Sequence, residues 1–218
     1  MRNSILKTTI LLSALFVFNT TSFSQILSWQ FSLPQELTGR EESVKASVVD
    51  PGLEDSELIR GASAKSGPGN SRGFSGSFPM DATKADARKS GAYYQFTIKA
   101  KDGYSVSLRK LNAILRRQEE SAHIYRWMYS LDGRKFKEIG DEDVMITDLN
   151  NNGVKQPAID LTAYPELQNI KSKTTITFRL YAWGGVSLEK SKRAFGFGKS
   201  NKAGSKVLWI DGVVTKAE

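Results

Sequence analysis

The amino-acid sequence predicts an all-β protein, an antiparallel two-sheet β-sandwich of the jelly-roll type, over residues 25–218. Apolar and polar residues alternate with period two in most of this range, which is typical of strands that have one buried face. The alternating segments are rich in aromatic and β-branched residues, and turns that contain glycine separate them. Many short strands at such spacing favour a sandwich over other fold classes.

Residues 1–24 are predicted to be a signal peptide and are excluded from the fold. Arg2 and Lys7 form a basic start, and the apolar run 8–18 is too short to cross a bilayer. Ser22 and Ser24 supply the small residues before a cleavage site at Gln25. No later segment has the length and apolarity of a transmembrane helix. We therefore expect an exported protein, and the periplasm, the cell surface and the extracellular medium are all open as destinations.

The composition of the chain limits the kinds of site and partner that we expect. The chain contains no cysteine, which excludes disulfides, a lipid anchor on cysteine, cysteine nucleophiles and cysteine-bound zinc. The formal net charge is +8, and removal of the signal peptide with its two basic residues and no acidic ones leaves +6. This excess favours polyanionic partners, among them acidic or sulfated polysaccharides, cell-surface polymers and nucleic acid. Ordinary surface charge that keeps the protein soluble explains it equally well.

The alternation indicates which residues share a face of each predicted strand. Leu27, Trp29 and Phe31 share one face of the strand 26–33, and Tyr94 and Phe96 share one face of the strand 92–100. The stretch 109–121 also fits an amphipathic helix, but it continues the alternation that begins at residue 104, so a strand is preferred. The predicted strands are 26–33, 43–50, 92–100, 104–118, 123–131, 174–183 and 206–215.

Other segments are predicted to lack strands. Residues 161–167 suit one short helical turn, and the sequence shows turn signals at 101–103, 131–133 and 150–153. Two stretches rich in glycine, serine and lysine are predicted to be long loops, which are often functional in compact domains. These loops are 61–77 and 189–206.

The strand 174–183 supplies the strongest functional hypothesis. If the even-numbered residues 176–182 face the core, then Arg179, Tyr181 and Trp183 point outward together. Exposed rings can stack on the apolar face of a pyranose, and a guanidinium can bind a carboxylate, sulfate or hydroxyl group. The alternative is that loops cover this face and that both rings are packing residues.

Two further arginines could support such a site. Burial of Leu115 and Trp127 would turn Arg116 and Arg126 outward on their strands, and together with Arg179 they would suit an anionic glycan. The alternative is that these arginines are scattered over solvated strands, as is common on protein surfaces.

Other candidate sites have weaker support. Residues 148–153 match the first half of a calcium-binding loop, but Ile159 occupies the position of the bidentate acid, so a polar turn is preferred there. Asp160 is expected to cap the turn that follows it. His123 is the only histidine and is not near a nucleophile motif, which argues against a catalytic triad. The acidic run 140–144 does not provide the carboxylate pair of a glycosidase.

Several stretches resemble secreted bacterial jelly-roll domains, similar to galactose-binding-like sandwiches and carbohydrate-binding modules. The stretch 125–136 resembles their strand–turn–strand with Tyr-Ser-x-Asp-Gly, and 207–215 resembles their closing strand. The resemblance implies a sandwich fold, and it implies that Asp211 could help to hold a structural calcium; no other cofactor is expected. The stretches that carry it are 57–67, 92–118, 125–136, 159–185 and 207–215.

Together these observations predict a non-catalytic, secreted carbohydrate-binding module for an extracellular polysaccharide, anionic in the favoured case. The ligand-binding residues would be Arg179, Tyr181, Trp183, Arg116 and Arg126. Two alternatives remain open. One is a jelly-roll polysaccharide lyase that uses tyrosine, arginine and lysine, and the other is a structural or adhesive cell-surface subunit with a protein partner. Nucleic acid is the less favoured polyanion.

Overall fold

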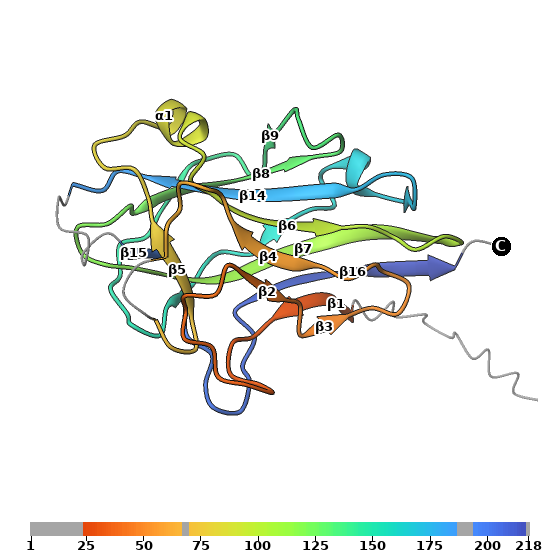
Figure 1. The fold of residues 1–218 in the computed structure, drawn as a ribbon. Helices are drawn as coiled ribbons and strands as arrows, with labels where there is room; N and C mark the ends of the chain where they lie inside the picture. Colours follow the sequence, from red (N-terminus) through yellow and green to blue (C-terminus); the bar gives the residue numbers. More distant parts are fainter. Residues whose placement is uncertain (1–23, 67–69, 187–193, 217–218) are drawn as a thin grey trace, which may run out of the picture.

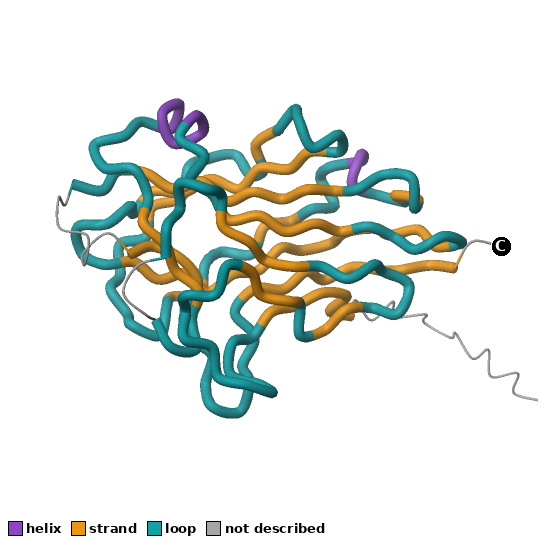
Figure 2. The backbone as a smooth tube through the Cα atoms, viewed as in Figure 1, coloured by secondary structure: helices purple, strands orange, loops and turns teal. Residues whose placement is uncertain are grey.

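Two antiparallel sheets pack face to face in the computed structural model, which describes residues 24–66, 70–186 and 194–216. The predicted signal peptide lies outside these residues except for Ser24. Figure 1 shows the sheets as two layers, and Figure 2 shows that strands dominate the described chain. The predicted all-β sandwich is therefore confirmed. Among the described residues no helix is long and apolar enough to span a bilayer.

The first sheet has nine strands and is built around β7, the longest strand of the chain. Its main path runs β3 (Val48–Val49), β1 (Ser24–Trp29), β16 (Leu208–Lys216), β7 (Tyr104–Arg117), β15 (Ala194–Phe197) and β5 (Phe74–Ser77). Three short strands also pair with β7: β11 (Val154–Lys155), β12 (Ile159–Asp160) and β13 (Ile170–Lys171). The prediction of a strand rather than a helix at 104–118 is confirmed.

The second sheet has seven strands and carries the strand 174–183 at its centre. Its path runs β10 (Val144–Met145), β8 (Ile124–Ser130), β14 (Ile176–Trp183), β6 (Tyr94–Ile98), β4 (Glu57–Arg60) and β2 (Ser43–Lys45), with β9 (Lys137–Glu138) paired to β8. The predicted single strand 43–50 is thus two strands, β2 and β3, that belong to different sheets. A 3-10 turn, η1 (Pro165–Leu167), occupies the predicted helical turn.

Two predicted loops contain strands. β5 lies within 61–77 and β15 within 189–206, and these two strands pair with each other and extend the first sheet. Their glycines explain the wrong prediction, since glycine weakens the strand pattern. At Gly196 a Cβ atom would meet the Phe74 carbonyl oxygen at 2.4 Å, so this close approach of strands requires glycine.

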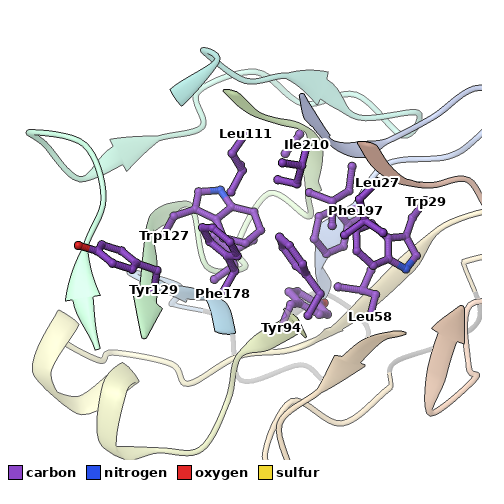
Figure 3. Packing of buried hydrophobic residues seen from close by; sticks show 14 of the residues in the cluster. Leu27, Trp29, Leu58, Tyr94, Leu111, Trp127, Tyr129, Phe178, Phe197 and Ile210 are labelled. Carbon is purple, nitrogen blue, oxygen red and sulfur yellow. The ribbon is translucent and has the colours of Figure 1, made fainter. Parts of the chain in front are cut away.

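The inward faces of the two sheets form the main hydrophobic core (Figure 3). Phe96 of β6 stacks on Phe178 of β14 with the ring centroids 5.0 Å apart, and Trp29 of β1 approaches Phe96 at 5.0 Å from the other sheet. Aromatic contacts of this kind add to the free energy of burying the rings. The core-facing residues of β14 are the predicted ones, because Ile176, Phe178 and Leu180 are fully buried.

Short polar turns connect the strands where the sequence predicts them. Gly103, Gly133 and Gly153 all have positive φ angles at the three predicted turns. In the 148–153 turn the Asn150 side chain accepts a hydrogen bond from the Asn152 amide at 2.8 Å. Asp160 accepts from the Thr162 amide and hydroxyl at 2.8 and 2.7 Å, so its predicted capping role is confirmed.

An acid-sensitive contact attaches η1 to the second sheet. Glu166 accepts hydrogen bonds from the Lys137 ammonium at 2.8 Å and from the Tyr129 hydroxyl at 2.5 Å. Lys137 first and Tyr129 next lower the pKa of Glu166 from 4.5 to about 2. Because the folded-state pKa is depressed, the stabilisation is complete above the unfolded value and is lost as the pH falls from 4.5 to about 2.

We expect Glu166→Gln to flatten this acid dependence. Because solvent screens the pair, the wild-type protein should lose about 1 kcal/mol more unfolding free energy than the variant between pH 5 and pH 2. Urea unfolding at several pH values measures both slopes. Equal slopes in the two proteins would show that the contact contributes nothing in solution.

Candidate functional site: a cationic pocket under helix α1

The outer face of the second sheet is partly covered by a short helix, α1 (Lys84–Lys89), which packs against β14 (Figure 1). The Thr83 side chain accepts a hydrogen bond from the backbone amide of Asp86, and the Asp86 carboxylate accepts one from the backbone amide of Thr83. These two hydrogen bonds form a capping box at the start of the helix. Ala87 of α1 is fully buried against the sheet, where it forms a second hydrophobic cluster with Met128, Tyr181 and Trp183. This helix was not predicted from the alternation of residues.

The predicted phase of β14 is confirmed, but the predicted exposure of its outer rings is wrong. Tyr181 and Trp183 point away from the main core, yet only 4% and 6% of their surfaces are exposed. Helix α1 covers them, and Phe136 and Tyr93 pack at the margin of the cluster. Trp183 therefore holds the helix on the sheet and does not offer a stacking face to solvent.

Arg126 lies beside Tyr181 on β8, as predicted for the outer face, but it too is buried, with 6% exposed. Its Nη2 donates to the Gly140 carbonyl at 2.5 Å, and its Nε and Nη1 lie 3.3 and 3.7 Å from Glu138 and Asp143, without hydrogen-bond geometry. Lys84 of α1 reaches the same two carboxylates at 3.2 and 2.8 Å. We call these four residues the clasp, because they tie α1 to the sheet.

The clasp also perturbs ionisation. A hydrogen bond from Lys84 to Asp143, and then one to Glu138, raise the pKa of the Lys84 ammonium against the opposing effect of burial. The acidic run 140–144 thus supplies one partner of a structural ion cluster. Arg126 is buried in this cluster, which corrects its predicted exposure, and ligand binding by Arg126 stays a prediction.

Arg116 does not join the outer face of the second sheet. It lies on β7 in the first sheet, opposite Gly196, with 8% of its surface exposed, and it donates to the Asn70 side chain. Burial lowers the pKa of its guanidinium, with an opposing effect from Tyr94. The predicted cluster of Arg116, Arg126 and Arg179 therefore does not form.

Arg179 is the predicted residue that remains accessible. It is half-buried, with its guanidinium carbon 4.0 Å from the ring centroid of Tyr93 and 4.2 Å from that of Phe136. Its Nε donates to Gln95 at 2.7 Å and its Nη1 lies 3.3 Å from the Tyr181 hydroxyl. Stacking and hydrogen bonds fix the guanidinium before any ligand arrives, which reduces the entropy lost on binding.

Arg179 and Tyr181 line a pocket of about 380 Å³ between α1 and the 132–136 turn. We call it the cationic pocket; its lining residues are Ala85, Arg88, Lys89, Arg134, Phe136, Arg179 and Tyr181. Among the described residues, this wall contains four cations and no carboxylate. Within the described part of the chain none of the four cations makes an ion pair.

A tight turn presents Arg134 to the pocket. The Asp132 carboxylate accepts from the amides of Lys135 and Arg134, both at 2.8 Å, and from the Ser130 hydroxyl at 2.8 Å. These hydrogen bonds, the Lys135 amide first, lower the pKa of Asp132 to about 2. Asp132 is therefore occupied with the turn backbone, and it leaves the Arg134 side chain unpaired.

Four residues of the pocket were not predicted from the sequence: Arg88, Lys89, Arg134 and Phe136. Two signals could have found them. The Thr83 and Asp86 spacing is a capping pattern that places Arg88 and Lys89 in the last turn of a helix. The Asp-Gly turn at 132–133 places Arg134 next to the start of a hairpin arm.

The described residues contain no group of three or more histidine, cysteine, aspartate or glutamate side chains that could hold a metal ion. Asp211 lies in β16 and accepts a hydrogen bond from the Asn112 amide group at 3.0 Å. Calcium at Asp211 stays a prediction. His123 is half-buried, with Nδ1 3.4 Å from the Ser121 carbonyl oxygen.

Comparisons with known proteins find little similarity to this chain. No protein-family model matches it, and no curated protein does. Among solved structures, the C-terminal domain of a chitobiase from Bacteroides fragilis is similar, with 14% identity and a TM-score of 0.29 over 83% of this chain and 99% of that domain. A likeness of this extent carries no argument about function, and the fold is established by the strand pairing itself.

Proposed function

We propose that the protein is an exported, non-catalytic module that binds an acidic polysaccharide in the cationic pocket. The observation that carries the proposal is the set of four unpaired cations around one hollow. Like charges held together repel one another and reduce the stability of the fold, and an anionic ligand relieves that cost. The neighbouring cations Lys84 and Arg126 form ion pairs with carboxylates, whereas the four cations of the described pocket lining form none.

The walls of the pocket suit a sugar that carries a carboxylate or sulfate group. Arg179 offers a fixed, planar guanidinium, which matches the geometry of such an anion. Phe136 and the Tyr181 hydroxyl add an apolar surface and a polar contact beside it. The predicted signal peptide supports an extracellular ligand.

Binding should be selective for charge and sensitive to salt. We expect residues 25–218 to be retarded in affinity electrophoresis by polygalacturonate or dextran sulfate and not by neutral dextran. The affinity should fall at least about tenfold between about 50 and 500 mM sodium chloride, because the Debye length shrinks over this range. Binding to neutral dextran of equal strength, or the absence of any salt effect, would contradict the proposal.

Duplex DNA serves as a control in the same experiment. If DNA binds as tightly as the acidic polysaccharides, the protein reads polyanion charge alone and the pocket has no preference for sugars. A variant with Lys171→Gln and Lys173→Gln removes two exposed charges away from the pocket and should leave binding unchanged.

One contact favours a second candidate, a polysaccharide lyase. Tyr181 places its hydroxyl 3.3 Å from Nη1 of Arg179, so a base and a charge neutraliser lie side by side. In such a reaction a base removes the C5 proton of a uronate, the C4–O bond breaks as a C4=C5 double bond forms, and the departing O4 takes up a proton from the protonated base or from water. Rising ultraviolet absorbance on polygalacturonate, lost in Tyr181→Phe, would establish this activity.

A further inference from the structure

A second aromatic and cationic group lies on the opposite side of the sandwich. Of the four tryptophans, Trp29, Trp127 and Trp183 are buried, whereas Trp209 of β16 is half-buried. Its chain neighbours Leu208 and Ile210 are fully buried in the main core. Trp209 therefore faces outward from the first sheet, and the cationic pocket faces outward from the second sheet.

Two lysines share the Trp209 ring. The ammonium nitrogen of Lys206 lies 4.7 Å from the centroid of the Trp209 ring, and that of Lys155 lies 5.9 Å from it. Lys206 also donates to the Gln25 side chain at 2.7 Å. Neither lysine makes an ion pair in the part of the chain that the structure describes.

The carboxylates of this face have other partners. Asp211, two residues along β16, accepts from Asn112, which is the cross-strand neighbour of Trp209. Asp160 lies across from Lys110 and accepts from Thr162. The two lysines thus lie near a partly exposed indole, and in the described residues neither forms an ion pair with these carboxylates.

We propose that Trp209, Lys155 and Lys206 form a second binding site for an acidic sugar. This inference rests on the proposed function, because it assumes the same class of ligand. Both lysines are exposed, so their ammonium groups can leave the ring to pair with a carboxylate or sulfate, which replaces the cation–π attraction. The uncovered indole then receives the apolar face of the pyranose.

Two sites on opposite faces make one copy of the protein bivalent. A polymer segment held in the cationic pocket points away from the Trp209 face, so the second site captures a different segment or a different chain. The protein therefore cross-links an acidic polysaccharide and does not simply coat it, and the two attachments raise the apparent affinity.

Light scattering tests the cross-linking. Polygalacturonate is titrated with the protein, and the scattered intensity should rise to a maximum and fall again when protein is in excess. The double variant Lys155→Gln/Lys206→Gln should still bind, about tenfold more weakly through loss of avidity, and should abolish the maximum. The control Lys171→Gln/Lys173→Gln removes the same charge about 23 Å along β7, near Ser105, and should keep it.

Tryptophan fluorescence gives an independent readout. Because the other three tryptophans are buried, acrylamide quenching reports mainly on Trp209, and polygalacturonate should reduce it. Trp209→Phe should remove this protection. Arg134→Gln, in the pocket, should weaken polymer binding but leave the protection of Trp209 at high polymer concentration.

The outcomes separate the two proposals. If the wild-type protein binds polygalacturonate but shows neither a scattering maximum nor protection of Trp209, the second site is refuted and the pocket stands. A lysine double variant that cross-links like the wild type also refutes it. If neither polygalacturonate nor dextran sulfate binds at all, both proposals fail.

Discussion

Arg179→Gln should weaken binding of an acidic polysaccharide by about 10- to 100-fold, because a hydrogen-bonded charge contact of about 1.5–3 kcal/mol is lost. Glutamine keeps a polar side chain between Tyr93 and Phe136 but removes the charge and the planar fork. Isothermal titration calorimetry with polygalacturonate fragments measures the change.

Two comparisons make this result specific. Arg179→Lys retains the charge without the fork and should recover only part of the affinity. Lys171→Gln removes the same charge from an exposed position and should have no measurable effect. If Arg179→Gln and Lys171→Gln weaken binding equally, the protein responds to its overall charge, and the pocket is not the binding site.

Trp183→Ala should reduce the free energy of unfolding by about 3 kcal/mol, as expected when a large buried aromatic residue is truncated. The Trp183 indole packs against Ala87 of α1, and the ammonium nitrogen of Lys84 lies 6.0 Å from the centroid of the indole ring. Loss of the ring should loosen α1, which carries Arg88 and Lys89 into the pocket. Urea unfolding followed by circular dichroism measures the effect on stability.

The conservative variant Trp183→Phe keeps an aromatic ring under the helix and should cost less than half as much. This pair distinguishes a structural role from the ligand-stacking role that the sequence suggested. Unchanged stability in Trp183→Ala together with lost sugar binding would show that Trp183 contacts the ligand and that the helix opens over it.

The alternation of residues predicts the inner faces of the sheets well. It assigns Phe96 and Phe178 to the core and identifies 104–118 as a strand, because period two reports directly on which side a residue faces. It does not report what covers the other side. The covering helix comes from residues 84–89, far in sequence from Tyr181 and Trp183, so the burial of these rings is a tertiary property.

The errors at β5 and β15 have a related cause. These strands contain Gly76 and Gly196, which a sequence pattern assigns to loops, but the glycines permit backbones to approach closely in the assembled sheet. The alternation of Phe195 and Phe197, both fully buried, was the signal that could have identified β15. For the site, Arg179 could be identified from its strand alone, whereas its cationic neighbours required the positions of α1 and the 132–136 turn.

The strands at the margins of the two sheets affect how the protein behaves at high concentration. β3 and β10 contain two residues each, β2 contains three and β5 contains four. Each margin therefore offers few unpaired backbone amides and carbonyls to the margin of another molecule. If many copies gather along one polymer, as we propose, this protection matters, because crowded copies with long open margins would assemble into fibrils.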